Sequence, residues 1–125
     1  MKRGFTLLEL IVVIIIIGVL ATLGLTQYSK VIEKGRTAEA KVVLGQMRTA
    51  QESYKLENGA YTATIGNLAI DVPTICLSTH YFFYSTTATT GTATRCAGGA
   101  GKPPTGTVGY VVTLDYAAGT WGGTA

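Results

Sequence analysis

The chain has 125 residues, with ten Lys and Arg against seven Asp and Glu, a formal net charge of +3 and a mean hydropathy of +0.33. This length has room for one small globular unit beside a membrane helix and hardly for two hydrophobic cores. Two of the basic residues are Lys2 and Arg3, and the rest of the chain has eight basic and seven acidic residues. This near balance of charge does not imply a nucleic-acid partner.

The first predicted element is an apolar run from Phe5 to Leu25, in which only Thr6, Glu9 and Thr22 are polar. At about 1.5 Å per helical residue this run reaches roughly the 30 Å thickness of a bilayer's hydrocarbon core. The run therefore predicts a membrane-spanning helix. Glu9 is its anomaly, because a carboxylate inside lipid is costly and usually marks a functional site with a partner. We find no partner for Glu9 nearby in the sequence.

Ordinary signal-peptide cleavage is the alternative for this run, since small residues occur between Val19 and Gly24. That interpretation leaves Glu9 unexplained and discards the beginning of a longer helix. Two further interpretations concern Gly18 and Gly24, which weaken a helix interior. Either the helix melts locally between Gly18 and Thr26 when it leaves the bilayer, or these glycines allow close contact between helices.

The helix is predicted to continue through a second, amphipathic half from Gln27 to Glu57. No proline interrupts it, and Asn58-Gly59 is a strong C-cap pair, so we expect one helix of about 50 residues. Two apolar stripes lie at different positions along the helix and indicate that the helix packs against different neighbours along its length. The lower stripe contains Ala40, Val43, Leu44, Met47, Ala50 and Tyr54, and the upper one Tyr28, Val31, Ile32, Gly35, Ala38 and Val42.

Beyond Gly59 the helical period disappears and the pattern predicts a small β region. A short helical turn is expected near Ile65–Leu68. The predicted strands are Tyr81–Ser85, Thr107–Tyr116 and Thr120–Gly122. They would form an antiparallel sheet of about three to four strands that covers the lower stripe of the helix, which makes the fold class α+β. The segment Thr86–Thr105, rich in Thr, Ala and Gly, is predicted to be a long surface loop.

The two cysteines, Cys76 and Cys96, have no His or Cys neighbours at zinc-binding spacing. In an oxidising compartment they are expected to form a disulfide, which would stabilise the fold by about 3 kcal/mol in the chain-entropy model. The alternative is a pair of unpaired buried thiols.

Catalytic chemistry is not indicated. His80 is the only histidine and has no triad partners, and the glycines before Lys102 lack the spacing of a phosphate-binding loop. No acidic cluster resembles a calcium loop. We therefore expect no enzymatic activity, no cofactor and no bound metal.

The start of the chain contains Lys2-Arg3-Gly4-Phe5-Thr6-Leu7-Leu8-Glu9, and the apolar run follows. This start closely resembles the prepilin signature of type IV pilins and of the related type II secretion pseudopilins. The resemblance implies that a prepilin peptidase cleaves between Gly4 and Phe5 and methylates the new amino group of Phe5. It also implies that Glu9 meets the cationic N-terminus of a neighbouring subunit, where pairing would make a buried charge tolerable.

The resemblance implies a domain organisation and a cellular route. Residues 1–4 would be a leader peptide, 5–26 a transmembrane and filament-core helix, 27–58 its amphipathic half, and 59–125 a globular β head. The protein would span the inner membrane once, with a cytoplasmic N-terminus, and then form a homopolymeric extracellular pilus with the help of the assembly machinery. Lys30, Lys34 and Arg36 follow the span, so this orientation depends on the resemblance and not on charge.

Three alternative functions are weighed against a pilus subunit. A secretion pseudopilin would often carry a C-terminal calcium loop, and this C-terminus offers only Asp115. A DNA-uptake pilin would need a basic patch, and the predicted loop offers only Arg95 and Lys102. Nucleic acid is therefore a possible but unsupported partner. The third alternative is a membrane-anchored domain that never polymerises, which would keep an unprocessed N-terminus.

Overall fold

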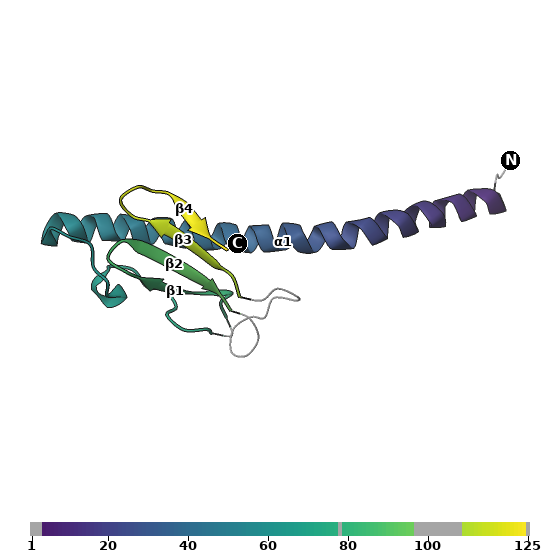
Figure 1. Cartoon of the computed structure of the whole chain (residues 1–125). Helices are drawn as coiled ribbons and strands as arrows, with labels where there is room; N and C mark the ends of the chain where they lie inside the picture. The colour runs from purple at the N-terminus through teal and green to yellow at the C-terminus, as the bar shows by residue number, and fades with distance from the viewer. Residues whose placement is uncertain (1–3, 78, 97–108, 125) are drawn as a thin grey trace. The chain divides into compact units, whose positions relative to one another are not determined.

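The computed structural model describes residues 4–77, 79–96 and 109–124 (Figure 1). One long helix is followed by a short 3-10 turn and four strands, which confirms the α+β class. The elements are α1 (Leu7–Asn58), η1 (Ile65–Asn67), β1 (Phe82–Thr86), β2 (Thr90–Arg95), β3 (Val111–Asp115) and β4 (Trp121–Gly123). The chain divides into two compact units, Met1–Gly35 and Arg36–Ala125, and α1 contributes residues to both.

The helix α1 has 52 residues without a break. It begins at Leu7, two residues after the predicted start at Phe5, and it ends at the predicted C-cap. Gly59 adopts a φ of +88°, and its N–H donates to the carbonyl of Lys55 at 2.7 Å. Glycine enters this left-handed conformation without a steric penalty, so Asn58-Gly59 closes the helix as the sequence indicates.

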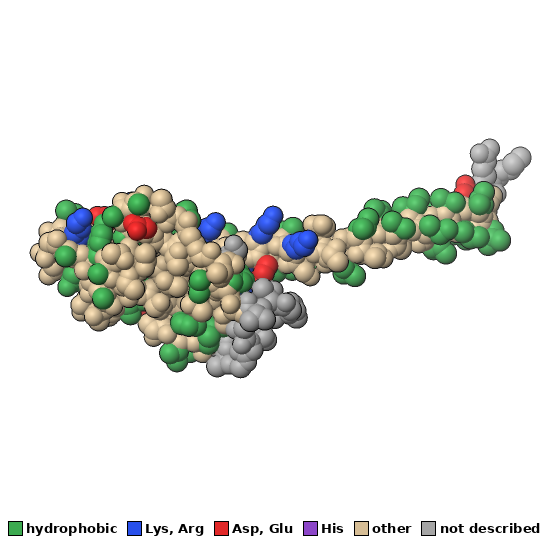
Figure 2. All heavy atoms as spheres, in the orientation of Figure 1, with side chains coloured by type: hydrophobic (Ala, Val, Ile, Leu, Met, Phe, Trp, Pro, Cys, Tyr) green, Lys and Arg blue, Asp and Glu red, His purple; other side chains and the backbone are tan. Residues whose placement is uncertain are grey.

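From Leu7 to Val31 the large apolar side chains of α1 are all exposed, from 42% at Ile11 to 76% at Leu7, and Phe5 before the helix is 83% exposed. Ile32 is half-buried. Hydrophobic side chains accordingly cover much of the visible surface of the N-terminal part of α1 (Figure 2). The hydroxyl of Thr22 donates to the carbonyl of Gly18 at 2.9 Å, and that of Thr26 donates to Leu23 at 3.0 Å. These bonds satisfy polar groups within the helix itself. By length and composition alone, α1 is able to cross a membrane.

In the second unit the strands form one antiparallel meander in the order β1-β2-β3-β4. The core lies between this sheet and α1. It contains Ala40, Leu44 and Met47 from the helix, Phe82 and Tyr84 from β1, Ala93 from β2, and Val112 and Leu114 from β3. The lower stripe is therefore the packed one, and of the upper stripe Tyr28, Val31 and Val42 are largely exposed.

Strand β2 contradicts the prediction of a long loop over Thr86–Thr105, because it occupies the middle of that segment. Its three buried residues are Gly91, Ala93 and Arg95, and the first of them is small for a steric reason. A Cβ on Gly91 would lie 2.7 Å from the Tyr116 hydroxyl and 3.2 Å from Cδ2 of Leu44. The sequence of β2 therefore lacks the large apolar residues at inward positions by which strands are usually recognised. The remainder of the predicted loop, from residue 97, lies outside the described residues, as do residues 107 and 108 of the predicted second strand.

The buried side chain of Gln51 attaches the segment after α1 to the helix. Its Oε1 accepts from the N–H of Thr62 at 2.9 Å, and its Nε2 donates to the Thr62 carbonyl at 2.8 Å and to the Thr86 hydroxyl at 3.0 Å. Thr86 in turn is hydrogen-bonded to the hydroxyl of Tyr116. Because each buried polar group has a partner, this network joins α1, β1 and the end of β3 without an energetic penalty for burial.

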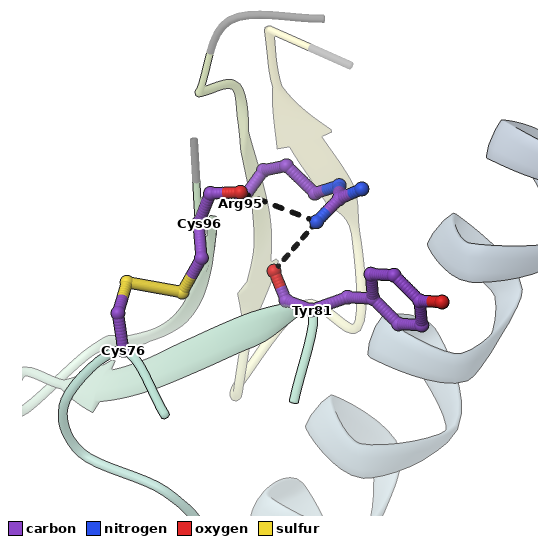
Figure 3. Close-up of a disulfide and its surroundings, with 4 residues drawn as sticks. All are labelled: Cys76, Tyr81, Arg95 and Cys96. Atoms are coloured by element: carbon purple, nitrogen blue, oxygen red, sulfur yellow. Dashed lines mark hydrogen bonds between the residues drawn. A yellow bond between two sulfur atoms is a disulfide. The ribbon is translucent and has the colours of Figure 1, made fainter. Parts of the chain in front are cut away.

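Cys76 and Cys96 form the expected disulfide, with their Cα atoms 5.8 Å apart (Figure 3). It ties the segment before β1 to the end of β2. Arg95 beside it is only 2% exposed, and its Nη1 donates to the carbonyls of Tyr81 at 3.0 Å and Cys96 at 3.3 Å. Its guanidinium also lies 4.8 Å from the centroid of the Tyr81 ring.

Candidate functional site

The start of α1 is organised by a reciprocal pair of hydrogen bonds between Thr6 and Glu9. The main-chain N–H of Thr6 donates to Oε2 of Glu9 at 2.7 Å, and the N–H of Glu9 donates to the Thr6 hydroxyl at 3.2 Å. The Thr6 hydroxyl also donates to Oε2 at 3.2 Å. This is a capping box, in which an N-cap threonine and a glutamate three residues later satisfy donors at the helix start.

The capping box corrects the expectation that Glu9 has no partner near it in the sequence. Thr6 is that partner, and the Thr-x-x-Glu spacing is the pattern that identifies it. The carboxylate also lies in the first turn of α1, where the helix dipole favours negative charge. Oε2 accepts both bonds from Thr6, and no described residue donates a hydrogen bond to Oε1. Glu9 therefore keeps one carboxylate oxygen available for another donor.

The peptide bond between Gly4 and Phe5 precedes the helix and is accessible. Both residues are exposed and outside regular secondary structure, and a Cβ added to Gly4 would meet no other described part of the chain within 4 Å. The Phe5 side chain, Leu8, Glu9 and Val12 line a shallow, open and mostly apolar hollow. The Gly4–Phe5 bond therefore lies outside α1, in the exposed backbone before its first turn.

The other sequence candidates lie apart from this site. Arg95, which the sequence places on an exposed loop, is buried, because its guanidinium satisfies carbonyls beside the disulfide. Lys102 lies outside the described residues. His80 is exposed and is hydrogen-bonded to the neighbouring Thr79 hydroxyl at 2.8 Å. Asp115 accepts from the N–H of Ala118 in the turn after β3, and the described residues contain no group of acidic, His or Cys side chains arranged for a metal.

The fold and the N-terminal site together define a pilin-like protein. A long helix packs on an antiparallel meander, and its exposed apolar start follows an accessible Gly-Phe bond and a Thr-Glu capping box. Residues 37–118 match the family model described as "Type IV pilin-like G and H, putative", and residues 1–25 match the "Prokaryotic N-terminal methylation motif". The chain belongs to the type IV pilin-like G and H family.

Three relatives illustrate the similarity. The chain is 40% identical to the type IV major fimbrial protein FimA of Dichelobacter nodosus over 57 residues, which are 46% of this chain and 36% of FimA. It is 40% identical to the type IV major pilin protein PilA of Myxococcus xanthus over 61 residues, which are 49% of this chain and 28% of PilA. It is also 40% identical to the type II secretion system core protein G of Escherichia coli over 76 residues, 59% of this chain and 52% of that protein.

The matched region thus spans less than two thirds of each of these relatives. No solved structure matches the chain significantly.

Proposed function

We propose that this protein is the structural subunit of a type IV pilus filament, polymerised through its apolar N-terminal helix. The observation that carries the proposal is the unburied apolar surface of α1 immediately behind the accessible Gly4–Phe5 bond. An apolar surface of this size requires lipid or other protein to cover it. Lipid would cover it before assembly, and neighbouring copies of the same helix would cover it in the filament.

Processing comes first in this proposal. A prepilin peptidase cleaves after Gly4, removing residues 1–4, and methylates the amino group of Phe5. Residues 5–26 then form the filament core, 27–58 the amphipathic half of the helix, and 59–125 the globular head. The methylation motif over residues 1–25 supports this step. The exposed, non-helical backbone at Gly4 and Phe5 gives a peptidase access to the bond.

Assembly depends on Glu9 in this proposal. Its free carboxylate oxygen accepts from the methylated amino terminus of Phe5 in a neighbouring subunit, while Oε2 keeps its bonds to Thr6. A buried carboxylate is tolerated when it is paired with a cation. A subunit placed out of register would leave Glu9 without this partner, so the pair also sets the register of the filament.

The protein is anchored in the inner membrane with its N-terminus in the cytoplasm before assembly, and lies outside the cell in the pilus afterwards. Its role is structural and not enzymatic, and it works with the pilus assembly machinery. The family membership and the length and composition of α1 support this route.

A pseudopilin of a type II secretion system is the second candidate. The match to secretion core protein G covers 76 residues, compared with 57 for FimA and 61 for PilA. A DNA-uptake role has less support, because Arg95 is buried.

The test separates a surface pilus from a secretion pseudopilus. Filaments sheared from intact cells are probed for this chain, and the cells are scored for release of secreted proteins after the gene is deleted. A pilus subunit is abundant in the sheared fraction, and its deletion leaves secretion intact. Loss of secretion without loss of surface filaments would instead identify a pseudopilin.

A further inference from the structure

The part of α1 within Arg36–Asn58 carries its charges in an unusual arrangement. Its buried residues, Ala40, Leu44, Met47 and Gln51, face the sheet. A helix that packs by one face usually places its charged residues on the opposite face. Here that face is uncharged, and the charges lie on its two flanks. The exposed residues of the uncharged face are Ala38, Val42, Gln46, Thr49, Ser53 and Leu56.

One flank is basic. Lys41, Arg48 and Lys55 are spaced seven residues apart, close to two turns, so they follow one another along one side of the helix. Each is held in place by a contact other than an ion pair. Lys41 Nζ lies 5.6 Å from the Trp121 ring centroid, Arg48 Nε donates to the Tyr116 carbonyl at 2.9 Å, and Lys55 Nζ lies 4.8 Å from the Tyr61 ring centroid.

The other flank is acidic. Glu39 and Glu57 are eighteen residues apart, which at 3.6 residues per turn is five whole turns, so they point in one direction. Lys41 follows Glu39 by two residues and therefore points about 200° away around the helix. Glu57 lines an open groove of about 420 Å³ together with Gln46, Ser53, Tyr54 and Asn67. Carboxylate, hydroxyl and amide oxygens beside an aromatic ring suit the ammonium group and alkyl stem of a lysine.

The charges of the two flanks form no ion pairs with one another or with other described residues. Among the described residues no carboxylate forms an ion pair with Lys41, Arg48 or Lys55, and none of the cations pairs with Glu39 or Glu57. Because the flanks lie on nearly opposite sides of one helix, a single copy cannot bring them together. A second copy placed beside the first in the same orientation can.

We propose that the acidic flank and its groove receive the basic flank of a second copy of this chain. Two different surfaces then meet, which makes the contact heterologous, and a heterologous contact repeats along an open-ended assembly unless a rotation closes it. The uncharged face between the flanks allows the helices to approach closely. This inference rests on the proposed filament and identifies the surfaces of the globular unit that set the lateral neighbour, in addition to the contact through Glu9.

The experiment reverses each flank in the full-length chain. Glu39→Lys with Glu57→Lys makes both flanks basic, and Lys41→Glu with Lys55→Glu makes both acidic. Each double variant is expressed alone and the two are expressed together, and sheared filaments are quantified. Ser85→Lys and Ser85→Glu are the matched controls, because Ser85 is exposed on the sheet away from this helix. Thermal unfolding of each purified variant identifies any that fail to fold, for which Glu57→Gln and Lys41→Gln replace the reversals.

Each double variant alone should give about tenfold fewer filaments, because like charges then face each other. Co-expression should restore the yield and give filaments containing both variants, while the controls should match wild type. Wild-type yield from either variant alone would overturn the flank contact and leave the filament proposal intact. Loss without restoration on co-expression would also overturn it and would indicate a different occupant of the groove. If wild type forms no filaments, the proposed function fails and this inference fails with it.

Discussion

Thr6 and Glu9 hold each other at the start of α1, with the Thr6 N–H 2.7 Å from Oε2 of Glu9. The Glu9 carboxylate therefore caps the helix of its own chain, in addition to the proposed contact with a neighbouring subunit. As a capping residue it needs hydrogen-bond acceptors, which glutamine also supplies. As the partner of a cationic terminus it needs its negative charge. These two requirements are separable by mutation.

Glu9→Gln should keep the helix start and lose assembly. In detergent micelles, hydrogen exchange of the amides of residues 6, 9 and 10, which are hydrogen-bonded at the helix start, should match wild type, because Gln serves in a capping box. Glu9→Ala should increase that exchange about fivefold, corresponding to roughly 1 kcal/mol of lost capping. Both variants should give few filaments. A normal yield from Glu9→Gln would show that the charge is dispensable.

Gly91→Ala should destabilise the globular unit by about 1–3 kcal/mol, as overpacking of a core does. The added Cβ would meet the Tyr116 hydroxyl at 2.7 Å. Chemical denaturation of the Gly91→Ala, Tyr116→Phe and double variants measures the energetic coupling between these two positions. The double variant should lose less unfolding free energy than the two single variants lose together. Gly45→Ala is the control, since no described side chain and no distant backbone of the described residues lies within 4 Å of a Cβ there. It should be neutral or mildly stabilising.

Gln51→Leu should cost about 2–4 kcal/mol, because it leaves both the N–H and the carbonyl of Thr62 without their partner. Leucine has a volume similar to that of glutamine, so the decrease in stability from lost packing alone would be small. Urea unfolding of Gln51→Leu and Gln51→Glu provides the measurement. An unchanged midpoint for Gln51→Leu would mean that water replaces the lost bonds.

Stability should fall at alkaline pH through Tyr84. Burial raises the pKa of this phenol from 10.0 to about 12, and the nearby Glu39 carboxylate adds to the shift. Below pH 10 the phenol is neutral in both the folded and the unfolded chain, so its stabilising contribution to the free energy of unfolding is fully present. Between pH 10 and pH 12 the unfolded chain ionises Tyr84 while the folded chain does not, so the free energy of unfolding decreases.

The loss through Tyr84 should be on the order of 2 kcal/mol. Urea unfolding of wild type and Tyr84→Phe at pH 9 and pH 11.5 measures it, and the variant should show the smaller decrease. Tyr61 contributes to the decrease in both proteins, because its hydrogen bond to Glu52 raises its pKa. Equal pH dependence in the two proteins would contradict the assignment to Tyr84.

Much of the fold follows from local patterns. The lower stripe of α1 is buried at Ala40, Leu44 and Met47. The predicted end of the helix at Asn58-Gly59 is confirmed, because only a residue that tolerates a positive φ can follow the helix there. The disulfide is predictable because two cysteines without metal-binding neighbours leave few alternatives. These features depend on a few residues close in sequence or on covalent chemistry.

The features that the sequence does not reveal depend mostly on contacts between distant residues. Strand β2 has Gly91 and Ala93 on its inward face because Tyr116 and Leu44 fill the space opposite, and neither is visible from the strand's own sequence. Arg95 is predicted on an exposed loop because it falls in the Thr-, Ala- and Gly-rich segment Thr86–Thr105. In the fold it is buried, and main-chain carbonyls beside the disulfide satisfy its guanidinium. The Thr6–Glu9 box is readable from its spacing, but an apolar run of membrane length points to the cost of Glu9 in lipid and not to its capping role.

In the proposed function, Gly4–Phe5 is a cleavage site whose product assembles. Its most direct test is the intact mass, with fragmentation of the N-terminal peptide, of this chain taken from sheared filaments. The account predicts a chain that begins at N-methylated Phe5 and is two hydrogens lighter for the Cys76–Cys96 disulfide. A chain that still begins at Met1, or one cleaved near Ala21, would contradict it.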